Sequence, residues 1–136
     1  MKRSILLGYQ LLTGLSDTLT GVLLIASPAL TLRLMGLQAD PSTFPFLSYI
    51  GTFVLSVGVA CLYGASLASR PGNSQKLETV WVLTAITRGS VALFIAASIY
   101  SRALENGWST VAISDGSFAL VQATGLWKGW LKDAAA

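Results

Sequence analysis

Three charged residues interrupt long apolar stretches, and their types and spacing could support chemistry. Asp17, Arg88 and Asp115 each lie inside a different apolar run, whereas every other formal charge lies outside these runs. A charge in apolar surroundings is costly unless it is paired and hydrogen-bonded. One guanidinium can donate to two carboxylates at once. The sequence therefore predicts a cluster of Asp17, Arg88 and Asp115, with one negative charge in formal excess.

Small and polar residues recur at helical spacing around these charges. They are Gln10, Gly14, Asp17 and Gly21 in the first run, Thr84 and Arg88 in the third, and Asp115, Ala119 and Gln122 in the fourth. Such spacing places residues on one helix face, and small residues there let helix backbones approach closely. The polar stripe has three interpretations: it packs the helices together, it forms a ligand or proton site, or it contacts another protein.

The composition excludes several kinds of chemistry. The chain has no histidine and one cysteine, Cys61, so it cannot form a Ser-His-Asp triad, a cysteine metal cluster or an intrachain disulfide. The net charge is +3, but the basic residues are not clustered among exposed aromatic residues, so the charge does not indicate nucleic-acid binding. We expect no catalytic residue, no metal, no cofactor and no nucleic-acid partner.

The apolar runs are long enough to be membrane spans. Of the 136 residues, 53% are hydrophobic and 11% are charged, whereas soluble domains carry about 25% charge. The runs are 5–27, 46–68, 79–100 and 108–127, and about 20 apolar residues suffice to cross a bilayer. The sequence predicts an all-α integral membrane four-helix bundle in a single domain, 1–136. At a rise of about 1.5 Å per residue, the three charges lie at similar depths, roughly 13 to 18 Å from the same surface.

Local signals mark the connections between the runs. Proline follows Ser27 and suits a first helical turn, so a short helix is expected over 28–35, lying in the headgroup region and ending at Gly36. Asp40 is expected to cap the next helix. The segments 70–74 and 105–107 are turn-forming. A signal peptide is the alternative for the first run, but Asp17 in its middle favours a permanent span.

The distribution of Lys and Arg predicts that both termini are cytoplasmic. With four spans, one side collects Lys2, Arg3, Arg70, Lys76, Lys128 and Lys132, and the other only Arg33 and Arg102. Aromatic rings prefer the membrane interface. We therefore expect a cytoplasmic aromatic belt of Trp81, Trp127 and Trp130 and an outer belt of Tyr49, Tyr100 and Trp108.

Several short segments occur in an order that points to a known group. They are Pro28 with the later Leu34-Met35-Gly36, the pair Thr87-Arg88, and Ser114-Asp115-Gly116 with Gln122. This order resembles the small four-helix membrane proteins of the DoxX-like group over most of the chain. The resemblance implies a four-helix membrane bundle that associates with other membrane proteins or with quinone-linked redox systems. It implies no catalytic residue at any position here.

The leading functional hypothesis is a small non-enzymatic integral membrane protein, either an accessory or a ligand-binding bundle. Its expected partners are membrane lipids and either copies of itself or a larger membrane complex. The candidate binding residues are Asp17, Arg88, Asp115, Gln10, Thr84 and Gln122. A cavity that reaches the three charges would favour ligand binding, whereas a closed cluster would favour packing.

Two alternatives belong to other classes of protein. The first is an oligomeric proton-coupled small-molecule transporter, because 15–17 and 113–115 are similar segments on helices of opposite direction, and inverted repeats are typical of transporters. Against it, Arg88 would neutralise the acid that a cation transporter needs free. The second is a quinone-linked membrane redox subunit, which requires an aromatic-lined cavity.

Overall fold

The computed structural model describes residues 2–135, and all regular secondary structure within them is helical. The helices are α1 (Arg3–Ala26), α2 (Pro28–Leu34), α3 (Phe44–Ala68), α4 (Ser74–Tyr100), α5 (Ser109–Trp127) and α6 (Trp130–Ala135), with the 3-10 turns η1 (Pro41–Thr43) and η2 (Asn106–Trp108). No strand occurs among these residues, which confirms the predicted all-α class. Each apolar run corresponds to one long helix.

Two helical segments of the described chain are long and apolar enough to cross a membrane. They are Pro41–Ala68, which combines η1 and α3, and Ser74–Tyr100, which is α4. Only 22% and 17% of their most apolar stretches are buried. The central helix of a soluble protein would instead be mostly buried. The four-span organisation stays a prediction.

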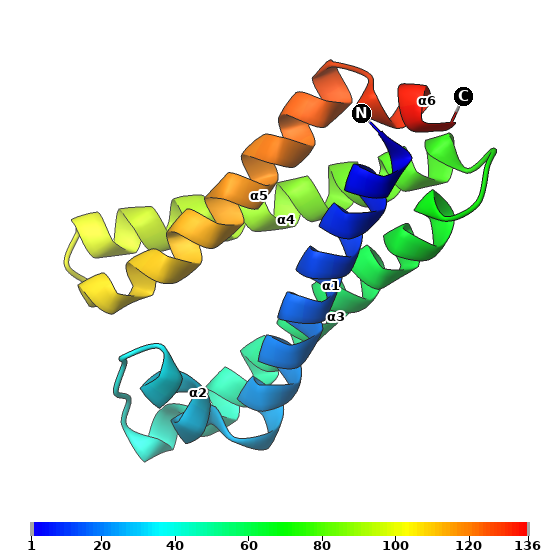
Figure 1. The fold of residues 1–136 in the computed structure, drawn as a ribbon. Helices are drawn as coiled ribbons and strands as arrows, with labels where there is room; N and C mark the ends of the chain where they lie inside the picture. The colour runs from blue at the N-terminus through cyan, green and yellow to red at the C-terminus, as the bar shows by residue number, and fades with distance from the viewer. Residues whose placement is uncertain (1, 136) are drawn as a thin grey trace.

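The four long helices form two antiparallel hairpins (Figure 1). Helix α1 packs along α3, and α4 packs along α5. The two hairpins meet at the end that holds both termini, α6 and the α3–α4 loop, and they diverge toward α2 and the α4–α5 loop. The molecule therefore has a packed end, near the termini, and a divergent end, near α2 and η2.

Glycines allow α1 and α3 to approach closely. A Cβ atom at Gly21 would lie 2.7 Å from the Cα of Leu55, and one at Gly14 would lie 2.9 Å from the backbone nitrogen of Leu62. Such separations are shorter than real Cβ contacts, so these positions require glycine. The stripe of small residues thus has a packing role in the first hairpin, as its spacing predicts.

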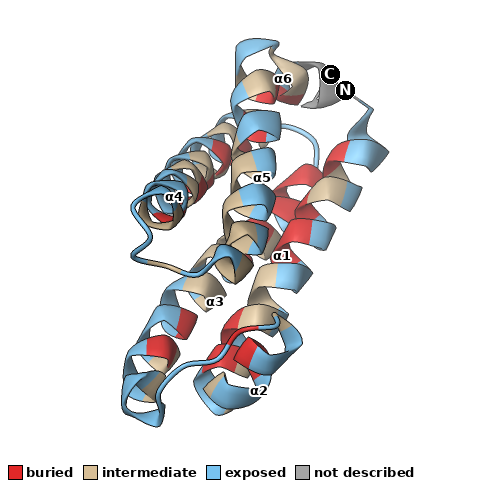
Figure 2. Ribbon diagram, turned by 90° about the vertical axis from the view of Figure 1, so that its left-hand side faces the viewer, coloured by how far each residue is buried: buried red, intermediate tan, exposed pale blue. Residues whose placement is uncertain are grey.

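The packed end contains an apolar core around Trp81, which is 0% exposed. Leu6, Leu77 and Leu131 surround it, and this buried region is red in Figure 2. The expected place of Trp81 in a cytoplasmic aromatic belt is therefore wrong. Gly125 explains the difference, because a Cβ there would lie 2.5 Å from the Trp81 ring, so its absence leaves room for the indole between the helices.

The connection between α1 and α3 follows the sequence signals. Gly36 has a φ of 72°, and the N–H of Leu37 donates to the Leu32 carbonyl at 2.8 Å, which is a glycine-based helix end. The Asp40 carboxylate accepts from the Ser42 N–H at 2.8 Å. Hydrogen bonds from the Ser42 side chain and backbone hold the pKa of Asp40 below its usual value. Asp40 is thus a genuine N-terminal cap.

The α4–α5 connection differs in detail from the sequence prediction. The segment 105–107 was expected only to break the chain, but Asn106 and Gly107 form η2 together with Trp108. The chain reverses at Arg102, which has a φ of 60°. Trp108 packs against the cluster of Leu32, Leu37 and Leu47. Trp108 is thus half-buried and packs against residues of the other hairpin, while its expected place in an outer aromatic belt stays a prediction.

Candidate functional site

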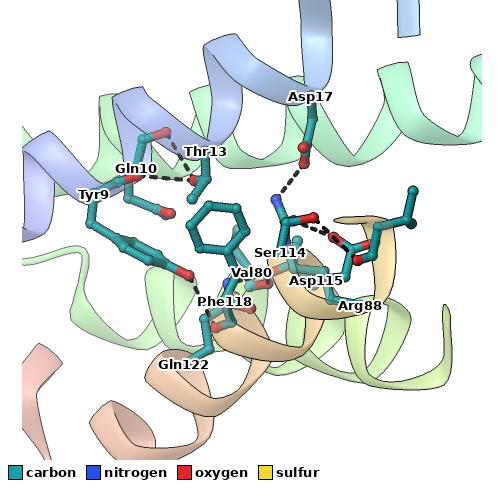
Figure 3. Close-up of polar contacts among 12 residues, drawn as sticks. Tyr9, Gln10, Thr13, Asp17, Val80, Arg88, Ser114, Asp115, Phe118 and Gln122 are labelled. Carbon is teal, nitrogen blue, oxygen red and sulfur yellow. Dashed lines mark hydrogen bonds and ion pairs between the residues drawn. The ribbon is translucent and has the colours of Figure 1, made fainter. Parts of the chain in front are cut away.

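The three charged residues meet between the hairpins, as the depth comparison predicts. Arg88 on α4 donates through Nη1 to Asp115 Oδ1 on α5 at 2.7 Å and through Nη2 to Asp17 Oδ2 on α1 (Figure 3). The Arg88 side chain is 2% exposed, whereas those of Asp17 and Asp115 are 15% and 22% exposed. We call these residues the charged triad. It joins the two hairpins through one shared guanidinium.

Aromatic contacts fix the guanidinium from one side. The Arg88 guanidinium carbon lies 4.9 Å from the centre of the Phe118 ring, a distance at which a cation is attracted to an aromatic face. The Tyr9 hydroxyl donates to the Phe118 carbonyl at 3.2 Å, and the Tyr9 ring packs against Trp81. These residues connect α1 with α5 and close the packed end beside the charged triad.

A cavity of about 310 Å³ extends from the charged triad toward the divergent end. All four long helices line it, and so does α2. The polar lining residues are Ser16, Asp17, Thr20, Thr87, Arg88, Ser114 and Asp115; the others are Leu24, Leu32, Met35, Leu47, Ile50, Phe53, Val54, Val57, Val91, Ile95, Trp108, Val111 and Phe118. Its volume falls at the lower end of the range for small-molecule sites, about 300 to 1,000 Å³.

The polar and apolar lining residues occupy different parts of the cavity. The charged triad and its neighbouring hydroxyls lie near the middle of the long helices, while Leu32, Leu47 and Trp108 lie near the divergent end. The two similar segments identified in the sequence meet here, because both Ser16-Asp17 and Ser114-Asp115 line the cavity. The arrangement suits a molecule with one polar end and an apolar body.

Each aspartate keeps one carboxylate oxygen free of hydrogen bonds. Asp17 uses Oδ2 and Asp115 uses Oδ1 toward Arg88, and within residues 2–132 no donor contacts their second oxygens. These second oxygens are not among the polar atoms that are both fully buried and without a hydrogen-bond partner. The free oxygens of both aspartates are therefore accessible, while the Arg88 side chain is almost completely covered, with one hydrogen bond from each Nη and none from Nε.

The remaining predicted site residues lie outside the cavity. Gln122 donates to the Thr84 hydroxyl at 2.7 Å, and Thr84 donates to the Val80 carbonyl at 2.8 Å. Gln10 is 0% exposed, and its amide atoms have no hydrogen-bond partner among the described residues. The expected polar stripe is therefore divided: the charged triad faces the cavity, whereas Gln10, Thr84 and Gln122 lie buried in the packed end.

The sequence did not identify the apolar wall of the cavity. Phe53, Val57 and Phe118 look like ordinary lipid-facing or packing residues in an apolar run, and Trp108 resembles an interfacial residue. Ser16, Ser114 and Thr87 carried a signal, as the neighbours of the three charged residues. The angle between the hairpins decides which apolar residues border a space.

No protein-family model, curated protein or solved structure matches this chain. The described residues also contain no group of three or more His, Cys, Asp or Glu side chains that could hold a metal ion. Function must therefore be argued from the cavity and from the charges that line it.

Proposed function

We propose that this chain is a non-enzymatic integral membrane protein of four spans that binds a small, largely apolar ligand between its two hairpins. The observation that carries the proposal is the cavity that reaches the charged triad. A cluster needed only for packing would be sealed on every side, because an ion pair in apolar surroundings gains from complete hydrogen bonding. Here both aspartates keep a free, accessible oxygen.

Exposed apolar side chains support a membrane location for all four long helices. Large apolar residues on each of them face outward, including Leu19 on α1 at 62%, Phe46 on α3 at 71%, Leu93 on α4 at 74% and Leu120 on α5 at 70% exposed. Exposed apolar surface of this extent is typical of lipid contact. Lipids are therefore the proposed surroundings, with further copies or a larger membrane complex as the proposed partners.

The proposed orientation places both termini and Gly72 in the cytoplasm and Pro41 and Asn106 outside. It is supported by the asymmetry of Lys and Arg and by the shared position of the termini and the α3–α4 loop at one end (Figure 1). Reporter fusions at Gly72 and Asn106 test it. Labelling of Gly72 from outside would contradict the orientation.

Ligand binding can be tested with n-butylbenzene, an apolar probe without a polar group. We expect it to raise the melting temperature of the detergent-purified protein in a saturable way, because a ligand that binds only the folded state stabilises it. Val57→Trp fills the cavity wall and should abolish the shift. Melting can be followed by circular dichroism at 222 nm.

Val59→Trp is the matched control for this experiment. Val59 lies on the same helix, is 54% exposed and does not line the cavity, so the shift should persist in that variant. Equal, unsaturated shifts in the native protein and both variants would mean that the probe acts through the micelle. That result would contradict a binding cavity.

A proton-coupled transporter is the second candidate, favoured by the meeting of Ser16-Asp17 and Ser114-Asp115 in one cavity. A proton pathway needs relay groups at successive depths, and the aromatic and apolar residues of the packed end supply none that ionises readily. We therefore expect no proton flux through the protein in liposomes, with or without ligand. Flux that disappears in Asp17→Asn would favour the transporter instead.

A further inference from the structure

We propose that the ligand of the cavity carries a protonated amine at one end of an apolar body and binds with its ammonium group against Asp17 and Asp115. This inference rests on the proposed ligand-binding function and specifies the ligand class. It follows from the charge at the polar end of the cavity, from the direction of the available hydrogen bonds, and from the position of the apolar lining.

The charge at the polar end is unbalanced. Asp17, Arg88 and Asp115 are the charged residues among those that line the cavity, and one guanidinium faces two carboxylates. The formal charge is therefore −1 in surroundings that are otherwise apolar. An unpaired charge in such surroundings is costly. A monovalent cation bound beside the two carboxylates restores neutrality.

The accessible groups of the charged triad accept hydrogen bonds. The free oxygens of Asp17 and Asp115 are acceptors, whereas the Arg88 side chain is 2% exposed. The N–H donors of Arg88 that lack a partner, including Nε–H, are therefore covered. A carbonyl group or a quinone would place its own acceptor oxygens against carboxylate oxygens, which repel them. An ammonium group offers three donors and the compensating charge.

The body of the ligand must be apolar and short. Beyond the charged triad the cavity is bordered by aliphatic side chains and by the rings of Phe53 and Trp108. Leu32 and Leu47, which pack with Trp108, border the far end. A primary amine on a phenylalkyl chain has the required distribution of polar and apolar groups.

A matched series of three probes tests this inference: 4-phenylbutylamine, 4-phenylbutan-1-ol and n-butylbenzene, which share one apolar body. Dissociation constants can be measured by isothermal titration calorimetry on the full chain in a neutral detergent. Because a hydrogen bond to a charged group is stronger than a neutral one, we expect the amine to bind at least about tenfold more tightly than the alcohol.

Asp115→Asn removes the excess charge while it keeps an oxygen that can accept from Arg88. We expect this variant to bind the amine about tenfold less tightly and the alcohol nearly unchanged, since neutralising a carboxylate removes the charged partner. The alcohol also shows that the variant is folded. Asp17→Asn is an independent second variant with the same expectation. Glu78→Gln, in the first part of α4 away from the cavity lining, is the charge-matched control.

Each outcome has a distinct meaning. Equal affinity for amine and alcohol, with no effect of Asp115→Asn or Asp17→Asn, would overturn the inference while leaving an apolar binding cavity in place. Tighter binding of the alcohol would also overturn it and indicate a neutral hydroxyl ligand. Failure of all three probes to bind would contradict the proposed function itself.

Discussion

The two hairpins differ in how their helices are held together. In the α1–α3 hairpin, glycines are required: a Cβ at Gly21 would lie 2.7 Å from the Leu55 backbone. In the α4–α5 hairpin, Gly125 is required at the packed end, where a Cβ would lie 2.5 Å from the Trp81 ring. Farther along the same hairpin, a Cβ at Gly89 would lie 4.0 Å from Ala119, and one at Gly116 would lie 3.6 Å from Ala92, which are ordinary contacts. The first hairpin is held by close backbone packing, whereas the second has room between its helices around Gly89 and Gly116 and relies more on polar bonds there.

This difference explains where the cavity lies. The tightly packed α1–α3 hairpin leaves no space of its own, so the space opens between the hairpins, where α4 and α5 face α1 and α3. The bonds from Arg88 to Asp115 and to Asp17 and the bond from Gln122 to Thr84 hold the second hairpin in place. The polar residues therefore serve both packing and the proposed binding site.

The largest effect is expected from removing the bond that joins the hairpins. Arg88→Leu leaves two carboxylates without their partner, and losing one member of a buried pair costs about 3 to 5 kcal/mol. The triple variant with Asp17→Asn and Asp115→Asn should recover much of this loss, since no charge then remains unpaired. The free energy of unfolding of Arg88→Leu and of the triple variant can be measured with sodium dodecyl sulfate in mixed micelles. Purely additive losses would show that the three charges do not interact.

A smaller effect on stability should distinguish the packing of the two hairpins, when a glycine in each is replaced by alanine. Gly21→Ala inserts a methyl group against the α3 backbone and is expected to cost about 1 to 3 kcal/mol. Gly89→Ala introduces the same group where it fits, and should stabilise α4 by about 0.5 to 1 kcal/mol because alanine favours helix. The same unfolding assay compares them. Equal costs at the two positions would contradict the difference in packing.

The smallest effect is expected at the divergent end, where Asp40 caps η1. Asp40→Ala should lower the melting temperature slightly at neutral pH. The hydrogen bonds from Ser42 hold the pKa of Asp40 below its usual value. The ionised carboxylate therefore stabilises the fold fully at any pH above that usual pKa. Its contribution is lost as the pH falls through the lowered pKa. The difference between native protein and variant should therefore vanish in acid.

Asp40→Asn is the control for this experiment, because asparagine also caps helices but does not titrate. It should keep most of the stability at neutral pH and remove the pH dependence. A difference between native protein and Asp40→Ala that persists in acid would show that the carboxylate is not the source of the effect.

Much of the fold could be predicted from local residue types. Helix ends at Gly36 and Asp40 follow from backbone geometry and from capping, which depend on a few neighbouring residues. The pairing of Asp17 with Arg88 and Asp115 follows from the cost of isolated charge. The four spans, the orientation and the resemblance to DoxX-like proteins stay predictions, because they concern the membrane and relatives rather than the chain's own contacts.

The aromatic residues show where prediction from sequence failed. Trp81 is expected in an interfacial belt because tryptophan favours that depth, whereas the structure places it in the packed core. That Trp108 borders the cavity was likewise not predicted. Position along a helix gives the depth of a residue, but the direction it faces depends on which helix lies beside it. Gly125 admits the Trp81 ring, a relation between distant segments that no local pattern contains.

The sequence by itself determined the helical class, the helix ends at the α1–α3 connection and the identity of the three charges that had to meet. Each of these depends on local hydrogen bonding, on helical periodicity or on the cost of an unpaired charge. Only the tertiary structure decided that the charged triad borders a cavity, that Gln10, Thr84 and Gln122 do not, and which apolar residues line the space. The reason is physical: a cavity is set by the angle between two hairpins, and that angle results from many packing contacts between residues far apart in the chain.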